Sequence, residues 1–220
     1  MVLMKNKIIG ITGFKGNIGK ILNHELKKYD SKIISFNGDI SKKKDTDIWI
    51  KKYNFDIIIH LASKSEVDYV LKNKRRSYKV NVTGTYNIVN SINSFATKKI
   101  IFFYSSSSHV YSYSNKKVKE NSNLKPINEY GKQKRYAENI LLKKLSNEHL
   151  LIIGRIFNFY NKNSNKSYFI NSIKNKIKKN KTIKIKDGYR NFTSVSEIGK
   201  SIIKLIKANK KGLYNISCNK

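Results

Sequence analysis

The sequence predicts an α/β protein with a doubly wound parallel sheet and a small carboxy-terminal region. Strand-length apolar runs alternate with amphipathic helical patterns along most of the chain, the order typical of βαβ units. A glycine-rich turn directly follows the first apolar run. With 220 residues, 39% of them hydrophobic, the chain is large enough to bury a core of its own.

The expected strands and helices follow one another from the amino terminus. We expect strands at residues 7–12, 32–36, 55–62, 99–105 and 149–155, and a short helix near 48–53. The other helices are predicted from apolar residues that recur every three or four positions. The first set, on one helical face, is Ile18, Ile21, Leu22, Leu26 and Tyr29. The second, which we expect to face the core, is Val82, Tyr86, Val89 and Ile92. The third is Tyr130, Lys134, Ala137, Leu141 and Leu145.

The composition changes after about residue 157. A loop rich in Asn, Lys and Ser leads to an expected helix at 168–179, a short strand at 182–185, a helix at 195–208 and a final strand at 212–217. We therefore divide the chain into a main domain, residues 1–157, and a small carboxy-terminal region, residues 158–220.

The net charge of +32 first suggests a nucleic-acid or anionic-membrane binder. The lysines, however, are spread along the whole chain and outnumber the arginines 41 to five. The densest stretch, residues 174–186, holds seven lysines and no aromatic residue that could stack on a base. A solvated basic face is therefore the expected interpretation, with no specific nucleic-acid partner.

Cysteine usage and apolar run length indicate the compartment. The one cysteine, Cys218, allows no disulfide framework and no Cys/His metal site. No apolar run approaches the roughly 20 residues of a membrane span. We expect a cytoplasmic protein without a transmembrane segment.

Gly13, Gly16 and Gly19 lie between the first strand and the first helix. Glycines there let backbone N–H groups and the helix amino terminus approach a pyrophosphate closely. Their spacing is one residue longer than the G-x-G-x-x-G dinucleotide fingerprint, and Lys15 is not followed by the G-K-[ST] of a P-loop. The position of the turn favours a Rossmann-like dinucleotide site over a purely structural loop.

Eight segments in order make the chain resemble the extended short-chain dehydrogenase/reductases, the NAD(P)-dependent nucleotide-sugar epimerase/dehydratase group. They are TGFKGNIG, NGDIS, HLAS, VNVTGTYNIV, FFYSSSSHVY, EYGKQK, RIFNFY and YRNFTSVSEIG. The resemblance covers nearly the whole length. It implies a cofactor domain over residues 1–157 and a substrate-binding region over 158–220.

The resemblance implies a set of cofactor contacts. It assigns the adenine to Asp39 and Ile40 and support of the active site to Asn81. The full set is Gly13, Phe14, Gly16, Asn17, Ile18, Gly19, Asp39, Ile40, Leu61, Ala62, Ser63, Asn81, Tyr130 and Lys134. The expected cofactor is NAD. NADP stays possible because the second strand ends without an acidic residue for the ribose 2′-hydroxyl, and Lys42, Lys43 and Lys44 follow nearby.

The same resemblance assigns catalysis to Ser107, Tyr130 and Lys134. A tyrosine with a pKa of about 10 is a poor base near neutrality, and a lysine one helical turn away lowers that pKa with its positive charge. Ser107 would donate a hydrogen bond to the sugar oxygen while Tyr130 moves the proton. Gln133 stands where the family usually has serine. A second pair with the same spacing, Tyr113 and Lys117, lies in a loop and has no such context.

The implied substrate contacts are Ser107, Ser108, Asn158 and Arg190, with Arg190 on the nucleotide diphosphate. Dehydratases of this group carry an Asp-Glu pair where this chain has Ser108 and His109, which argues against 4,6-dehydration. The substrate region is about 60 residues, shorter than in most relatives. A smaller substrate, a pocket completed by a partner, or lost activity would each fit that length.

We therefore expect an enzyme that transfers hydride at a sugar carbon of a nucleotide sugar, as an epimerase or a 4-keto reductase, without a metal. The resemblance also implies a homodimer, formed by the helices that begin near Ser77 and Tyr130. Two alternatives of other classes stay open: a non-catalytic NAD(P)-binding sensor or interaction module, and a basic binder of nucleic acid or anionic membranes.

Overall fold

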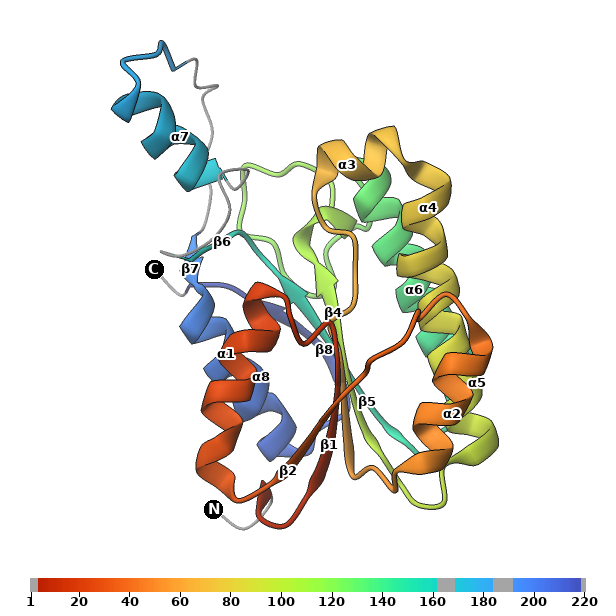
Figure 1. Ribbon diagram of the computed structural model, residues 1–220. Coiled ribbons are helices and arrows are strands. Elements are labelled where there is room, and N and C mark those ends of the chain that lie inside the picture. Colours follow the sequence, from red (N-terminus) through yellow and green to blue (C-terminus); the bar gives the residue numbers. More distant parts are fainter. Residues whose placement is uncertain (1–3, 162–168, 184–191, 219–220) are drawn as a thin grey trace.

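A six-stranded parallel sheet with helices on both faces organises the chain (Figure 1). The computed structural model describes residues 4–161, 169–183 and 192–218. The strand order is β2-β1-β3-β4-β5-β8. Their bounds are β1 Ile8–Thr12, β2 Lys32–Ser35, β3 Ile57–His60, β4 Ile101–Ser107, β5 Leu150–Ile156 and β8 Gly212–Ile216.

Two helical layers cover the sheet (Figure 1). Helices α1 (Asn17–Leu26) and α8 (Val195–Ala208) pack on one face. Helices α2 (Lys43–Lys52), α5 (Gly84–Phe95) and α6 (Glu129–Lys144) pack on the other. Because side chains alternate along a strand, Ile57 and Ile59 join the first core, whereas Ile58 between them joins the second. Both faces of the central strands are buried, as a doubly wound sheet requires.

Short elements complete the chain at the carboxyl ends of the strands and at its surface. They are the 3₁₀ turns η2 (Lys27–Tyr29) and η4 (Ser108–Val110), helices α3 (Val67–Lys72), α4 (Lys74–Tyr78) and α7 (Phe169–Lys178), the π-helical turn η3 (Lys79–Thr83), and a two-stranded sheet of β6 (Phe159–Tyr160) and β7 (Thr193–Ser194). The π-helical turn joins α4 directly to α5. Such turns occur often at functional sites.

The predicted fold class and main elements are confirmed. The helix expected at 195–208 has those bounds as α8. The five residues of the third periodic set are all buried: Tyr130, Lys134, Ala137, Leu141 and Leu145. The expected strand at 182–185 is wrong for Thr182 and Ile183, which belong to no strand; the rest of it lies outside the described residues. No helix in the described ranges is long and apolar enough to span a bilayer.

Tyr86 is a correction, because it was expected in the core and is 39% exposed. The other members of its predicted set, Val82, Val89 and Ile92, are buried as expected, and Thr85 rather than Tyr86 completes their spacing of three and four residues. Thr85 and Ile88 take the inward positions, with exposures of 1% and 0%.

Elements that follow residue 157 contribute to this sheet as well as to the small one. Strand β8 pairs with β5, from Ile152 opposite Gly212 to Ile156 opposite Ile216, and α8 packs against α1. The boundary at 157 therefore stays a prediction about where the substrate region begins, within a continuous sheet.

Candidate active site

The predicted site residues gather at the carboxyl edge of the sheet. Thr12, His60 and Tyr104 are register partners across β1, β3 and β4. The glycine turn after β1, the loop after β3 and the serines at the end of β4 consequently lie at one edge. In open α/β sheets this edge is where ligands bind.

The glycine turn forms a cradle that side chains would fill. Gly13 has a φ of +72°, and a Cβ there would lie 2.7 Å from the Ala62 nitrogen. A Cβ on Gly19 would lie 2.6 Å from the carbonyl oxygens of Gly13 and Phe14. Gly16 begins α1 without a side-chain cap, so the first backbone N–H groups of this helix, from Asn17 and Ile18 on, are available to an anion. These predicted cofactor residues are brought together and fit a dinucleotide diphosphate.

His60 links β3 to the cofactor loop as a neutral ring. The Thr12 hydroxyl accepts hydrogen bonds from the Leu61 and Ala62 nitrogens, both at 3.2 Å, and lies 2.6 Å from His60 Nδ1. His60 Nε2 lies 3.1 Å from the Thr85 hydroxyl. Burial and, to a smaller extent, the Lys134 cation together lower the pKa of His60 to about 3. The neutral His60 ring thus holds the Thr12 hydroxyl that fixes Leu61 and Ala62, two predicted cofactor contacts.

The loop after β2 is held by its own polar groups. Asp39 Oδ1 accepts hydrogen bonds from the nitrogen and the hydroxyl of Ser41, at 3.0 and 2.8 Å, and these bonds lower the pKa of Asp39. Ile40 is buried against Gly84. Lys43, one of the three lysines considered for a 2′-phosphate, forms an ion pair with Asp47 at 2.6 Å.

Ser107 and Tyr130 are brought together through His109. The His109 nitrogen donates to Ser107 Oγ at 3.2 Å, and its ring meets the Tyr130 ring edge-on, with centroids 5.6 Å apart. Asn128 caps α6 by accepting from the Gly131 nitrogen at 2.9 Å. Its amide nitrogen lies 2.8 Å from His109 Nδ1. Helix α6 is therefore docked on the turn that carries Ser107.

Lys134 lies on the same buried face of α6 as Tyr130. It is 2% exposed, and its Nζ donates to the Ser105 carbonyl at 2.6 Å. The Nζ lies 4.8 Å from the centroid of the Tyr104 ring and 5.8 Å from that of Tyr130. Burial lowers the pKa of Lys134 to about 7, although Glu138 opposes this shift. The three predicted catalytic residues thus lie around the end of β4, where Ser107 and Tyr130 both contact His109 and Lys134 bonds to Ser105.

Sequence reasoning missed a buried ion pair beneath this group. Glu138, 0% exposed, accepts two hydrogen bonds from Arg155 at 3.0 and 2.9 Å and one from the Ser106 hydroxyl at 2.6 Å. Arg155 also donates to the Tyr111 hydroxyl at 2.8 Å. The spacing of Lys134 and Glu138, four residues apart on the buried helix face, was the available signal.

The other predicted residues have different outcomes. The Asn158 carbonyl accepts from the Thr193 nitrogen at 3.0 Å, which joins β6 to β7. Arg190 lies outside the described residues. Tyr113, of the competing Tyr113/Lys117 pair, has a side chain that is 85% exposed and belongs to neither hydrophobic core. Within the described ranges, no cluster of His, Cys, Asp and Glu could hold a metal ion.

The cradle at the sheet edge and the Ser–Tyr–Lys set define a dinucleotide-binding protein of the short-chain dehydrogenase/reductase class. Residues 8–220 match the family described as GDP-mannose 4,6 dehydratase, and the chain belongs to this family of NAD(P)-dependent nucleotide-sugar enzymes.

Curated relatives and solved structures agree with this assignment. The chain is 32% identical over 124 residues to a bifunctional UDP-glucose 4-epimerase and UDP-xylose 4-epimerase of Pisum sativum, covering 55% of this chain and 35% of that protein. It is 27% identical to a GDP-6-deoxy-D-talose 4-dehydrogenase of Aggregatibacter actinomycetemcomitans, covering 89% and 69%. Its structure resembles dTDP-4-dehydrorhamnose reductase of Bacillus anthracis in complex with NADP, at 25% identity and a TM-score of 0.84, covering 98% and 76%. The match to the first of these relatives spans about a third of that protein's length.

Proposed function

We propose that the chain is an NAD(P)-dependent enzyme that oxidises or reduces a sugar carbon of a nucleotide sugar, as an epimerase or a 4-keto reductase. The observation that carries this proposal is the placement of Ser107, Tyr130 and Lys134 around the end of β4. They lie at the same sheet edge as the glycine cradle after β1. The relatives named above act on nucleotide sugars.

Tyr130 would exchange the proton of the reacting sugar hydroxyl. Its phenolate would be stabilised by the Lys134 ammonium, which the Ser105 carbonyl holds 5.8 Å from the centroid of the Tyr130 ring. Because Ser107 Oγ already accepts the His109 N–H, its own hydrogen is directed elsewhere and can donate to the sugar oxygen as that oxygen becomes a carbonyl. A bound NAD(P) would supply the hydride acceptor or donor for this reaction.

Glycine positions and the loop after β3 would hold the cofactor. The diphosphate would lie on Gly13, Gly16 and the amino terminus of α1, and Ala62 and Ser63 would line the nicotinamide side. We assign NAD(P) without separating the two forms. The end of β2 carries no acidic residue for a ribose 2′-hydroxyl. The Ser41 hydrogen bonds lower the pKa of Asp39 most, and the nearby Lys42 charge lowers it by a smaller amount.

The substrate end supports redox chemistry without dehydration. Ser108 and His109 follow Ser107, so the two carboxylates that a 4,6-dehydration would use for proton transfer at this point are not supplied by these positions. Ser108, Asn158 and Arg190 stay proposed contacts of the sugar nucleotide. The small β6–β7 sheet ends beside Asn158 and supports its assignment to that side.

The test is a panel of UDP-, dTDP-, GDP- and CDP-sugars, followed by nicotinamide absorbance and by product stereochemistry. A reductase consumes NAD(P)H in proportion to a 4-keto sugar, whereas an epimerase changes the sugar with no net cofactor change. Tyr130→Phe should lower kcat by about 100-fold or more and leave the NAD(P)H dissociation constant within about twofold. Turnover unaffected by Tyr130→Phe would refute the mechanism; cofactor binding without turnover on any sugar would favour the sensor alternative.

We also propose a homodimer formed by the α4–α6 face. Tyr78 and Tyr136 are 44% and 53% exposed there and contact each other, with ring centroids 6.5 Å apart. Tyr86 and Leu142 add exposed apolar surface on α5 and α6. Adjacent exposed aromatic residues of this kind mark interaction sites. Sedimentation should give a dimer at micromolar concentration, and Tyr136→Glu should give a monomer; a monomeric wild-type protein would contradict the proposal.

A further inference from the structure

Gln133 departs from the serine that the family usually has, and it lies inside a closed hydrogen-bond network. It is the only glutamine in the chain and is fully buried on α6, next to Lys134 in sequence. Its Oε1 accepts from Asn81 Nδ2 at 2.8 Å. Its Nε2 donates to the Ser77 hydroxyl at 3.0 Å and more weakly to the Lys74 carbonyl at 3.4 Å.

Asn81 passes this contact on to the cofactor loop. Its Oδ1 accepts from the Lys64 nitrogen at 2.7 Å and from the Ser63 hydroxyl at 3.0 Å, and its Nδ2 donates to the Lys64 carbonyl at 3.0 Å. With the bond to Gln133, both donors and both acceptor positions of this buried amide are used. The Lys64 N–H can only donate, so the Asn81 atom facing it must be the amide oxygen. The Lys74 carbonyl can only accept, so the Gln133 atom facing it must be the amide nitrogen.

We propose that Gln133 is a positioning residue that locks the cofactor loop, residues 61–64, to the catalytic helix α6. Asn81 lies in the π-helical turn η3, which carries its amide between Lys64 and Gln133. A serine at 133 is shorter by two heavy atoms and cannot reach Asn81 from this backbone position. Asn81 would then keep a buried N–H without an acceptor, a state that folded proteins avoid.

The Gln133–Asn81 bond sets the position of the cofactor loop relative to helix α6. Lys134 follows Gln133 on α6, and Ser63 and Lys64 follow the strand whose end faces the glycine cradle. Loosening the Gln133–Asn81 bond lets the loop and the helix move relative to each other. Both NAD(P)H affinity and kcat should then fall, because catalysis depends on sub-ångström placement.

Two substitutions of nearly equal size separate positioning from packing. Gln133→Glu, which burial keeps protonated, retains a carbonyl acceptor for Asn81 Nδ2 and an O–H that can donate to the Ser77 hydroxyl. Gln133→Met keeps the length and apolar volume but has neither group. If the role is positioning, Gln133→Glu retains NAD(P)H affinity within about threefold while Gln133→Met and Gln133→Ser lose about tenfold. If Gln133 only fills space, Gln133→Met is the better tolerated of the two and the proposal is overturned.

The expected loss of kcat rests on the proposed function. A measurement that needs no cofactor, amide hydrogen exchange, tests the positioning role separately. Amide hydrogen exchange should be slow at Lys64 in the wild type and in Gln133→Glu, and at least tenfold faster in Gln133→Met. Asn93→Ala is the matched control, since Asn93 bridges α5 to Lys144 and Ser146 at the far end of the same helices. It should leave Lys64 exchange and NAD(P)H affinity unchanged.

The outcomes are distinct. Lys64 exchange that is equal in the wild type and Gln133→Met overturns the positioning role, whatever the enzyme does. Exchange and affinity that follow the predicted order, together with no turnover on any nucleotide sugar, support the positioning role and contradict the proposed reaction.

Discussion

At the scale of single residues, the buried His60 makes stability depend on pH. Burial holds its folded-state pKa at about 3, against an ordinary value of 6.5. Between these values the unfolded chain binds a proton that the folded protein does not bind. Stability therefore falls as the pH falls through this window, by roughly 1.4 kcal/mol for each pH unit below 6.5.

His60→Gln should be less stable than the wild type at pH 7, because hydrogen bonds to Thr12 and Thr85 change. The gap in the free energy of unfolding should narrow as the pH falls toward 5, since glutamine does not titrate. Urea unfolding at pH 7, 6 and 5 measures this gap. A constant gap for His60→Gln would contradict the structural role assigned to the neutral ring.

Which residues could be predicted depended on how far their partners are along the chain. Tyr130 and Lys134 share one helix, so their spacing and a family motif were sufficient to place them together. Arg155 lies 17 residues from Glu138, and Asn81 lies 52 residues from Gln133. Those pairings depend on the final arrangement of α5, α6 and β5, which no local pattern encodes. Gln133 was recognised only as a departure; its partners explain it.

At the scale of elements, the docking of α6 on the 3₁₀ turn η4 depends on Gly131. A Cβ at Gly131 would lie 2.1 Å from the His109 carbonyl oxygen, which is backbone and cannot move alone. Gly131→Ala should therefore lower the free energy of unfolding by about 1–3 kcal/mol. Turnover should fall as well, because the change pushes Tyr130 away from the turn that carries Ser107.

Lys132→Ala is the control for helix propensity, since Lys132 is exposed on the same turn of α6. It should change stability by less than about 0.5 kcal/mol. Denaturant titration and initial rates measure both quantities. Gly131→Ala as stable and active as Lys132→Ala would mean that the close approach of α6 to His109 is not required.

Periodicity predicted the long helices and missed their junctions. Helix α8 has an uninterrupted apolar face, with Ile198, Ile202 and Ile206 buried, so its predicted bounds were confirmed. The segment from α4 to α5 reads as one helix, yet a π-helical turn interrupts it. Buried amide bonds from Asn81 accompany this turn. A period of 3.6 residues contains no signal for such a turn.

At the scale of the whole molecule, the parallel sheet was predictable because alternating strands and helices leave few possible connections. The placement of β8 was not. Its residues follow a region of changed composition, and only pairing with β5 brings them into the main sheet. The excess of lysine likewise has meaning only for the folded protein as a whole, where 46 basic residues face 14 acidic ones.

This charge should make stability rise with salt. Most of the basic side chains cannot find an acidic partner, so their mutual repulsion destabilises the compact state. Raising NaCl from about 0.01 M to about 0.15 M shortens the Debye length from about 30 Å to about 8 Å and screens that repulsion. The buried Glu138–Arg155 pair is screened much less. A gain of about 1 kcal/mol would raise the Tm by about 2–4 °C in a chain of this size.

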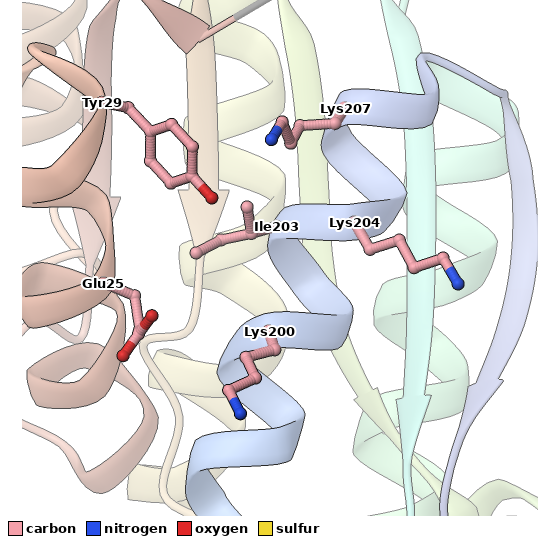
Figure 2. A pocket seen from close by; sticks show the side chains of 6 residues that line it. All are labelled: Glu25, Tyr29, Lys200, Ile203, Lys204 and Lys207. Atoms are coloured by element: carbon pink, nitrogen blue, oxygen red, sulfur yellow. The ribbon is translucent and has the colours of Figure 1, made fainter. Parts of the chain in front are cut away.

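A groove of about 220 Å³ between α1 and α8 offers a local test of the same repulsion. Figure 2 shows Lys200 and Lys207 lying toward Glu25 and Tyr29 across this groove, with Lys204 on the same helix pointing away. Lys207 Nζ lies over the Tyr29 ring, 4.6 Å from its centroid. Lys204 follows Lys200 by four residues and precedes Lys207 by three, spacings at which like charges on a helix repel.

Lys204→Glu should therefore raise the Tm at about 0.01 M NaCl, through roughly 0.5–1 kcal/mol from two relieved repulsions and two new attractions. Lys204→Gln should give about half of that gain, because it removes a positive charge without adding a negative one. Both gains should shrink near 0.15 M, where screening has already weakened the interactions. Thermal unfolding across a salt series measures all three proteins. A wild-type Tm that falls with added NaCl would mean that attractive ion pairs, such as those of Asp56 with Lys7 and Lys98, outweigh the net charge.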